Sequence, residues 1–401
     1  MIATSKIVLY TYLFLSLFAL FFCGSLTIGP LSLRNYSSLL LMAVAFIAGR
    51  KEYIIDKVVR HFVIYIILCV IVNIINGSFL STPFIRMMLV YQLPSIIVLF
   101  SLPKLLNDKE DLVAIIVIIA LLYVVNMLIT YGEYIGDSLA WSIAFGVGLE
   151  MPDDVDTFEL GSFLAGVTGN VVNNGYFLAT FLPVVSICIW KERFLYRLTG
   201  YLLLFVAAFV IYIVQQRMAF LSLAFFLFLV FIYKKDKYII IGTLVLFLYI
   251  QIYGNMLSSV EMGRLSSETS NDDREYLWTQ FKVFANSPEI LFGGLKAYFE
   301  KYHFTIQHNA ITSSFVIGGI PIFISFVILS YHILKSIYSH LKNVKTVNIV
   351  YVPLCTGCFI YYCYSMTHSQ GIQNGAVHFW LLYAIILAYD KTYEFQYRNN
   401  S

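Results

Sequence analysis

Long apolar runs separated by short polar stretches recur along the whole chain, and they predict its main elements. About 20 consecutive apolar residues are enough for a helix to cross the ~30 Å hydrocarbon layer of a bilayer. The runs and their polar flanks predict twelve membrane-spanning helices, at residues 7–28, 36–49, 62–76, 84–103, 112–131, 171–190, 198–214, 218–233, 238–254, 310–334, 347–364 and 376–390. The pattern indicates an all-α polytopic integral membrane protein, with residues 1–401 forming a single membrane domain.

The composition agrees with this interpretation. Of the 401 residues, 60% are hydrophobic and 12% are charged, whereas a soluble domain has roughly 25% charged residues. The first apolar run is longer than the ~7–15-residue core of a cleavable signal peptide, so it is interpreted as a retained first span. The composition therefore excludes an ordinary soluble domain.

All six cysteines lie inside apolar runs. Disulfide frameworks are typical of small secreted domains, and thiolate metal sites need charged ligands that are costly in lipid. Cys355 and Cys358 have the CxxC spacing of some zinc sites but lack further ligands, so they are interpreted as small residues that pack between helices. The sequence predicts neither a disulfide framework nor a metal site.

The basic residues predict which ends of the spans face the cytoplasm, because cytoplasmic loops carry an excess of Lys and Arg. If the N-terminus is cytoplasmic, only eight of the 26 basic residues lie outside: Arg34, Arg86, Arg217, Arg264, Arg274, Lys282, Lys296 and Lys301. We therefore expect both termini to be cytoplasmic.

Two segments on the predicted outer side are much longer than the other connections. The first, residues 132–170, is an acidic extracytoplasmic loop that contains no Lys or Arg. Its Asp153-Asp154-x-Asp156 run could suggest a divalent cation, but such sites need ligands gathered in a defined geometry. We interpret it as a solvated acidic loop whose acidic residues are Glu133, Asp137, Glu150, Asp153, Asp154, Asp156 and Glu159.

The second, residues 253–309, is a large extracytoplasmic loop. Residues 273–286 within it are predicted to form an amphipathic helix, because Leu277, Phe281 and Phe284 repeat at i, i+4 and i+7. Ser287-Pro288 should end this helix, and Gly293-Gly294 should form a tight turn. Arg274 and Trp278 are four residues apart and are expected to share one helical face.

Three cationic or protonatable side chains fall on the predicted outer side: Arg217, Arg274 and His308. Arginine binds phosphate oxygens bidentately, and a cluster at a lipid boundary is suited to a lipid diphosphate. An arginine such as Arg217, between two spans, can instead be a snorkelling residue, so both interpretations stay open. Arg264 and Arg86 are further candidates for anion binding.

His308 has the chemistry of a general base, since an unperturbed imidazole has a pKa of ~6.5 and could take a proton from a sugar hydroxyl. An interfacial histidine or a helix cap is the alternative. Trp278 could stack on a sugar or belong to an interfacial aromatic belt. Asn174, at the start of the sixth span, either holds helices together or lines a polar cavity. We predict that Arg264, Arg86, Trp278, Asn309 and Asn174 bind substrate.

This ordered set resembles the bacterial O-antigen ligase and Wzy-type polysaccharide polymerase superfamily. The resemblance covers the chain in its layout of spans, but in its motifs only residues 215–320. The matching pieces are Gln216-Arg217, Arg274 with Trp278 and Ser287-Pro288, Gly293-Gly294, and His308-Asn309 followed by Gly318-Gly319-Ile320.

The resemblance implies a GT-C-like glycosyltransferase of the bacterial cytoplasmic (inner) membrane that uses neither a cofactor nor a metal. Its substrate would be an undecaprenyl-diphosphate-linked oligosaccharide in the membrane lipid, and a chain-length regulator and a flippase would be its partners, with no nucleic acid. Arg217 and Arg274 would bind the diphosphate, and His308 would position or deprotonate the acceptor hydroxyl.

The sequence leaves three functions to compare. A polymerase of oligosaccharide repeat units is favoured over an O-antigen ligase that transfers the glycan to lipid A-core, because sequence-divergent members are more often polymerases. A flippase is disfavoured, because transporters commonly show paired halves and charged midplane helices. Here the charges gather in one outer loop, and no repeat is visible in the sequence.

Overall fold

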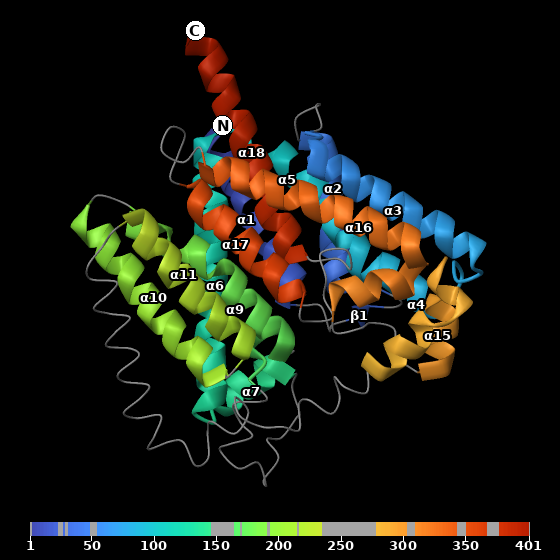
Figure 1. Cartoon of the computed structure of the whole chain (residues 1–401). Helices are drawn as coiled ribbons and strands as arrows, with labels where there is room; N and C mark the ends of the chain where they lie inside the picture. Colours follow the sequence, from blue (N-terminus) through green and yellow to red (C-terminus); the bar gives the residue numbers. More distant parts are fainter. Residues whose placement is uncertain are drawn as a thin grey trace. The chain divides into compact units, whose positions relative to one another are not determined.

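The structure is a computed structural model that describes residues 2–22, 27–28, 31–48, 54–145, 164–168, 171–190, 193–214, 216–234, 278–302, 309–342, 350–366 and 377–400. Packing divides the single predicted membrane domain into two compact units (Figure 1). Unit 1 comprises Met1–Ile115 with Asn271–Ser401, and unit 2 comprises Ile116–Ser270.

Unit 1 is helical apart from one pair of two-residue antiparallel strands among its described residues. Its elements are α1 (Ile2–Phe22), β1 (Thr27–Ile28), β2 (Leu31–Ser32), α2 (Leu33–Ala48), α3 (Lys57–Ile75), α4 (Thr82–Arg86), the π-helical turn η1 (Met87–Gln92), α5 (Leu93–Leu105), the start of α6 (Lys109–Tyr134), the 3-10 helix η4 (Pro288–Ile290), α15 (Leu295–Tyr302), α16 (Ala310–Lys342), α17 (Tyr351–Ser365) and α18 (Val377–Asn400).

Unit 2 contains the rest of α6 and a set of shorter helices. These are α7 (Ser138–Phe145), the 3-10 helix η2 (Gly166–Thr168), α9 (Val171–Val185), the 3-10 helix η3 (Ser186–Trp190), α10 (Phe194–Val214) and α11 (Arg217–Lys234). Helix α9 packs against both α10 and α11.

Six helices in the described part of the chain are long and apolar enough to cross a membrane, which supports a multi-pass membrane protein. They are Lys57–Ile75, Thr82–Leu105, Lys109–Tyr134, Asn173–Trp190, Phe194–Val214 and Ala310–Lys342. Shorter apolar helices occupy the predicted spans 7–28, 36–49 and 218–233, and α17 and α18 lie in the last two. The predicted span 238–254 lies outside the described residues, so the total of twelve remains a prediction.

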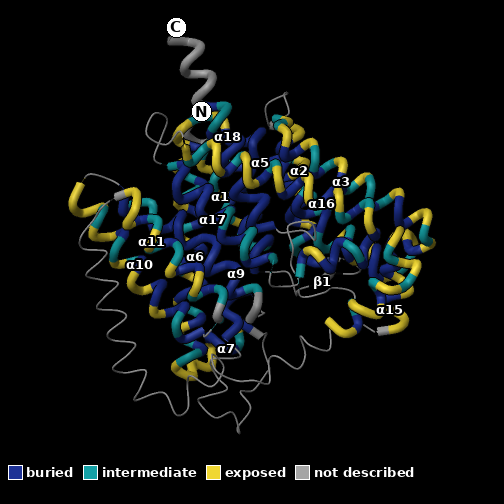
Figure 2. Tube along the Cα trace, viewed as in Figure 1, coloured by how far each residue is buried: buried dark blue, intermediate teal, exposed yellow. Residues whose placement is uncertain are grey.

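The core of unit 1 is built around α18. Residues 377–388 of this helix are buried on every side, as expected for a helix without a polar face (Figure 2). Helices α5 and α17 pack against it, and Trp380 stacks on Phe62 of α3 with ring centroids 4.0 Å apart. A predicted span can therefore be an interior helix of the bundle.

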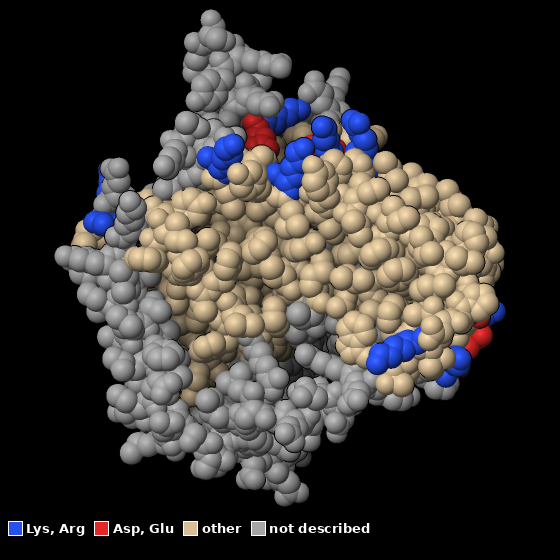
Figure 3. All heavy atoms as spheres, viewed as in Figure 1, with Lys and Arg blue, Asp and Glu red and all other residues tan. Residues whose placement is uncertain are grey.

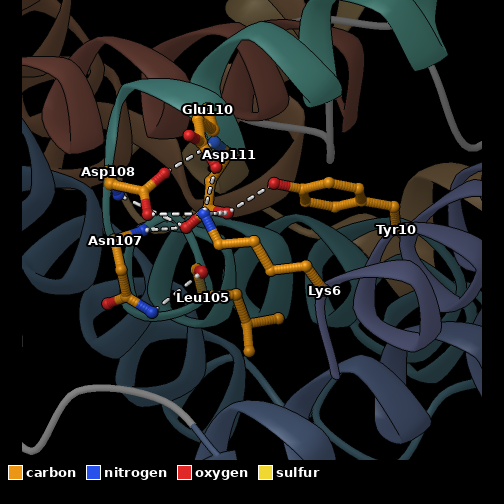
Figure 4. A network of polar contacts seen from close by, with 7 residues as sticks. All are labelled: Lys6, Tyr10, Leu105, Asn107, Asp108, Glu110 and Asp111. Carbon is orange, nitrogen blue, oxygen red and sulfur yellow. Dashed lines mark hydrogen bonds and ion pairs between the residues drawn. The ribbon is translucent and has the colours of Figure 1, made fainter. Parts of the chain in front are cut away.

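A network of polar side chains ties α1 to the connection between α5 and α6 (Figure 4). Lys6 Nζ donates to Asp108 Oδ2 at 2.8 Å and to Glu110 Oε2 at 2.6 Å. Tyr10 Oη donates to Asp111 Oδ1 at 2.9 Å. Partial burial raises the pKa of Asp108, but hydrogen bonds from Lys6 and from the Asp111 N–H outweigh it and hold the pKa below its usual value. The N-terminal helix thus lies beside a connection that the sequence also predicts to be cytoplasmic.

Helices α3 and α16 run antiparallel, and this arrangement separates the two ends of unit 1. The His61 ring stacks on His332 at 4.0 Å, whereas Asn73 contacts Ile317 near the other end of both helices. At the first end, Tyr383 donates to Asp56, and His340 bonds Asp390 at 3.0 Å. On the face drawn in Figure 3, basic side chains gather near the start of α3 and α18 and again over α15, and the surface between these two groups shows no charged side chains. This agrees with the alternation of spans expected for unit 1.

Candidate functional site

Helix α16 is interrupted at Gly318 and Gly319. Gly319 has φ 63° and ψ −151°, a conformation that is essentially restricted to glycine. Pro321 has no N–H, so the carbonyl of Ile317 has no donor four residues ahead. Two carbonyls before the break accept bonds from outside the helix: Val316 O from the Gly294 N–H at 3.1 Å and Ile317 O from Asn73 Nδ2 at 3.0 Å.

The Gly293-Gly294 turn lies directly against this break. A Cβ atom on Gly293 would lie 2.5 Å from Gly318 Cα, and one on Gly319 would lie 2.6 Å from Gly293 N. Gly293 also has a φ of 73°, which favours glycine. The two backbones therefore pack directly against each other, and we call this contact the glycine crossing. It joins Gly293-Gly294 and Gly318-Gly319, which both belong to the motifs of the sequence resemblance.

Residues 278–285 form a helix that agrees with the described part of the predicted amphipathic helix. Phe281 faces Phe315 of α16 with ring centroids 6.1 Å apart, and buried Phe284 contacts Tyr298 of α15 edge-on at 5.6 Å. Lys282 and Val283 are exposed on the other side. Ser287 and Pro288 follow as the cap and first residue of η4. The helix thus lies with its aromatic face on α15 and α16.

Three of the predicted substrate-binding residues belong to this part of unit 1. Trp278 begins the described part of the helix, is 49% exposed and contacts Phe281 at 6.1 Å. Asn309 caps α16, because its Oδ1 accepts the N–H groups of Ile311 at 2.8 Å and Thr312 at 3.4 Å. Arg86 is exposed at the end of α4, which packs against α15.

We call residues 278–302, together with Asn309 and the part of α16 before its break, residues 310–317, the loop module. Its parts are joined by the Phe281–Phe315 and Phe284–Tyr298 contacts and by the bond from Gly294 to Val316. It carries Trp278 and Asn309. The loop module therefore contains two predicted residues that are 31 positions apart in the sequence.

In unit 2, Asn174 is fully buried and its amide is fully used. Its Oδ1 accepts from Asn126 Nδ2 at 2.7 Å, and its Nδ2 donates to Thr130 Oγ1 at 3.2 Å and to Leu164 O at 3.0 Å. Of the two alternatives for this residue, the contacts favour holding helices together, because buried amides are stabilised by satisfied hydrogen bonds. Substrate binding by Asn174 stays a prediction.

Glu133 corrects the interpretation of residues 132–170 as solvated throughout. Its side chain is completely buried, with Oε1 accepting the Ala165 N–H at 3.2 Å and Oε2 the Gly166 N–H at 2.7 Å. The segment 164–168 is also buried, and Gly166 at φ 56° leaves no room for a Cβ beside Asn126. A buried carboxyl group needs such donors to offset its lost hydration. The loop therefore returns into the helical core of unit 2 before α9 begins.

Arg217 is the first residue of α11, at the end of unit 2 where α9 begins. This placement follows from the chain path, since α10 starts beside η3 and runs back along α9 before α11 starts. The remaining predicted residues, Arg264, Arg274 and His308, lie outside the described residues. Asp153, Asp154 and Asp156 of the acidic loop lie outside them as well.

No family model matches the chain, and a search of curated proteins finds no significant match. The function is therefore argued from the residues and their geometry.

Apart from Glu133, which was named as part of the acidic loop, some residues that hold these elements were not singled out in the sequence. Asn126, Thr130 and Glu133 recur at i, i+4 and i+7, which places them on one face of an otherwise apolar helix. That polar stripe was a usable signal for a buried network. Asn73 and Asn76 lie three residues apart at the end of a predicted span. Pro321 lacks an N–H, so the carbonyl four residues before it, that of Ile317, needs a donor from another part of the chain.

Proposed function

We propose that the protein is a membrane glycosyltransferase that polymerises undecaprenyl-diphosphate-linked oligosaccharide repeat units into a surface polysaccharide, such as O-antigen or capsule, on the extracytoplasmic face. The observation that supports this most is the backbone crossing of Gly293-Gly294 with Gly318-Gly319. It anchors a polar segment at the break of a membrane-length helix. Arg274 lies four residues before Trp278 in this segment, and His308 directly precedes the Asn309 cap.

The proposed chemistry needs groups that stabilise a leaving diphosphate. Arg217 and Arg274 would bind its oxygens, with Arg264 and Arg86 adding positive charge. Charge-assisted hydrogen bonds of this kind contribute about 1.5–3 kcal/mol each. Trp278 is half exposed on the loop module, so its ring is available to stack on a sugar.

The acceptor hydroxyl would attack the anomeric carbon as the bond to the diphosphate oxygen breaks. His308 would take the hydroxyl proton or position the hydroxyl, and the leaving diphosphate would remain on its lipid. Attack from the face opposite the diphosphate inverts the anomeric centre. We propose that the reaction needs neither a metal nor a nucleotide sugar.

Deletion of the gene, followed by gel analysis of surface polysaccharide, separates the two transferase alternatives. A polymerase defect should leave single repeat units attached to the acceptor, because attachment continues without chain growth. Loss of a ligase should instead leave long lipid-linked chains that are absent from lipid A-core. The latter result would replace the polymerase proposal with the ligase.

The same strain tests the flippase alternative. A flippase defect keeps lipid-linked repeat units on the cytoplasmic side, so neither single-unit nor polymeric glycan should reach the surface. Complementation with the intact gene is the matched control. Accumulation of cytoplasmic lipid-linked repeats would contradict the proposed transferase.

A further inference from the structure

We propose that Asn73 and Asn76 of the α3 end are positioning residues that hold the loop module, and with it Trp278 and Asn309, in the geometry that glycan transfer requires. This inference rests on the proposed function. Neither asparagine contacts a substrate in the proposal. Both act through backbone atoms of the loop module.

Asn76 fixes the loop side of the glycine crossing. Its Nδ2 donates to Phe292 O at 2.9 Å, and its Oδ1 accepts the Ser78 N–H at 3.0 Å. Phe292 directly precedes Gly293, the residue that lies against Gly318. Nearby, the Lys296 N–H donates to Ser78 Oγ at 3.3 Å, so the end of α3 holds the loop at two points.

Asn73 fixes the helix side of the same crossing. It is completely buried, and its Nδ2 donates to Ile317 O at 3.0 Å and to Cys69 O at 2.8 Å. Ile317 directly precedes Gly318 and has no helical donor because residue 321 is proline. Asn73 therefore satisfies a carbonyl that the break would otherwise leave unpaired in an apolar surrounding, where such a group is costly.

The two amides together set the position of both segments that cross. Asn73, in the last turn of α3, and Asn76, its C-cap, are three residues apart, and each bonds the residue that precedes a crossing glycine. A Cβ on Gly293 would lie 2.5 Å from Gly318 Cα, so the two backbones are in direct contact and a shift of either one toward the other would clash. The end of α3 thus fixes the position of the loop module through two side-chain hydrogen bonds to its backbone.

The expected consequence is kinetic. Trp278 lies on the helix that packs against Phe315, and Asn309 caps the half-helix that contains Phe315. Loosening the bond from Asn76 should misplace both residues while leaving their chemistry intact. Since a displacement of ~1 Å at a site can cost about 10²-fold in rate, we expect at least about a tenfold loss of kcat with a smaller change in KM.

The test compares the purified full-length protein with its Asn76→Asp variant, using a synthetic lipid-diphosphate-linked repeat unit as the probe. Asn76→Asp keeps an oxygen that can accept the Ser78 N–H, removes the donor to Phe292 O and adds a negative charge beside that carbonyl. Hydrogen–deuterium exchange over residues 291–297 reports the anchoring independently of activity. We expect faster exchange there, together with the lower kcat.

Asn107→Ala is the matched control, because Asn107 Nδ2 donates to Leu105 O at 3.2 Å at the other end of unit 1. It should leave kcat and exchange over 291–297 unchanged. Asn76→Gln, which keeps the donor, should recover part of the rate. If the unaltered protein is active and Asn76→Asp keeps its kcat, the positioning role is wrong. If the unaltered protein is inactive, the proposed function falls and this inference falls with it.

Discussion

Replacing Arg274 with alanine is expected to lower the rate of glycan transfer by about 10²–10³-fold, because removal of one preorganised donor to a developing charge costs about this much in well-studied enzymes. Arg274→Lys should recover only part of the rate, since an ammonium group keeps the charge but not the bidentate fork. The measurement is the initial rate with a lipid-diphosphate-linked repeat unit and purified protein.

Lys282→Ala is the control for this prediction. Lys282 is an exposed basic residue on the same helix as Trp278, so its removal takes away a positive charge from the same segment. We expect a change of less than about threefold, because exposed charges are largely screened by salt. Equal losses in the two variants would indicate a nonspecific charge effect and would contradict the assignment of Arg274.

Gly319→Ala is expected to have the largest effect on stability. A left-handed non-glycine backbone of this kind costs ~1–3 kcal/mol, and forcing an extra carbon into a filled space adds a similar amount. The added Cβ would lie 2.6 Å from Gly293 N, Ile290 O and Leu291 C, and all three are backbone atoms that cannot rotate away. The free energy of unfolding in detergent should fall by about 3 kcal/mol or more.

Two other glycines separate the causes of this loss. Gly77 has φ 72° but no atom within 4 Å of an added Cβ, so Gly77→Ala should show the backbone strain alone, about 1–2 kcal/mol. An alanine Cβ at Gly294 would meet its nearest atoms at 3.7 Å, so Gly294→Ala should be close to neutral. A Gly319→Ala variant as stable as Gly294→Ala would contradict the backbone crossing.

Much of the helical layout could be predicted from apolar runs, because lipid forces backbone groups to satisfy one another within each helix. The structure has helices at every predicted span in its described residues, but some ends differ by up to about ten residues, as at the ends of α16 and α18. The burial of α18 could not be predicted from its own run. An apolar helix looks the same in sequence whether it faces lipid or other helices.

The polar contacts that build the candidate site were harder to predict. Gly293-Gly294 and Gly318-Gly319 were visible as separate turn and motif residues, but only the fold shows that their backbones touch. Glu133 was grouped with a solvated loop because its partners are the backbone N–H groups of residues 165 and 166. Every residue except proline has such a group, so the residue types do not reveal these bonds. Contacts to backbone atoms are therefore the part that sequence patterns miss.

The most direct test of the account is a reaction with three components: the purified full-length protein in liposomes, a lipid-diphosphate-linked oligosaccharide repeat unit, and buffer with a metal chelator. We expect a ladder of lipid-linked products that grow by whole repeat units, without added nucleotide sugar. We also expect the ladder to be lost in the Arg274→Ala and His308→Ala variants. A substrate that crosses the liposome membrane without being elongated would contradict the account.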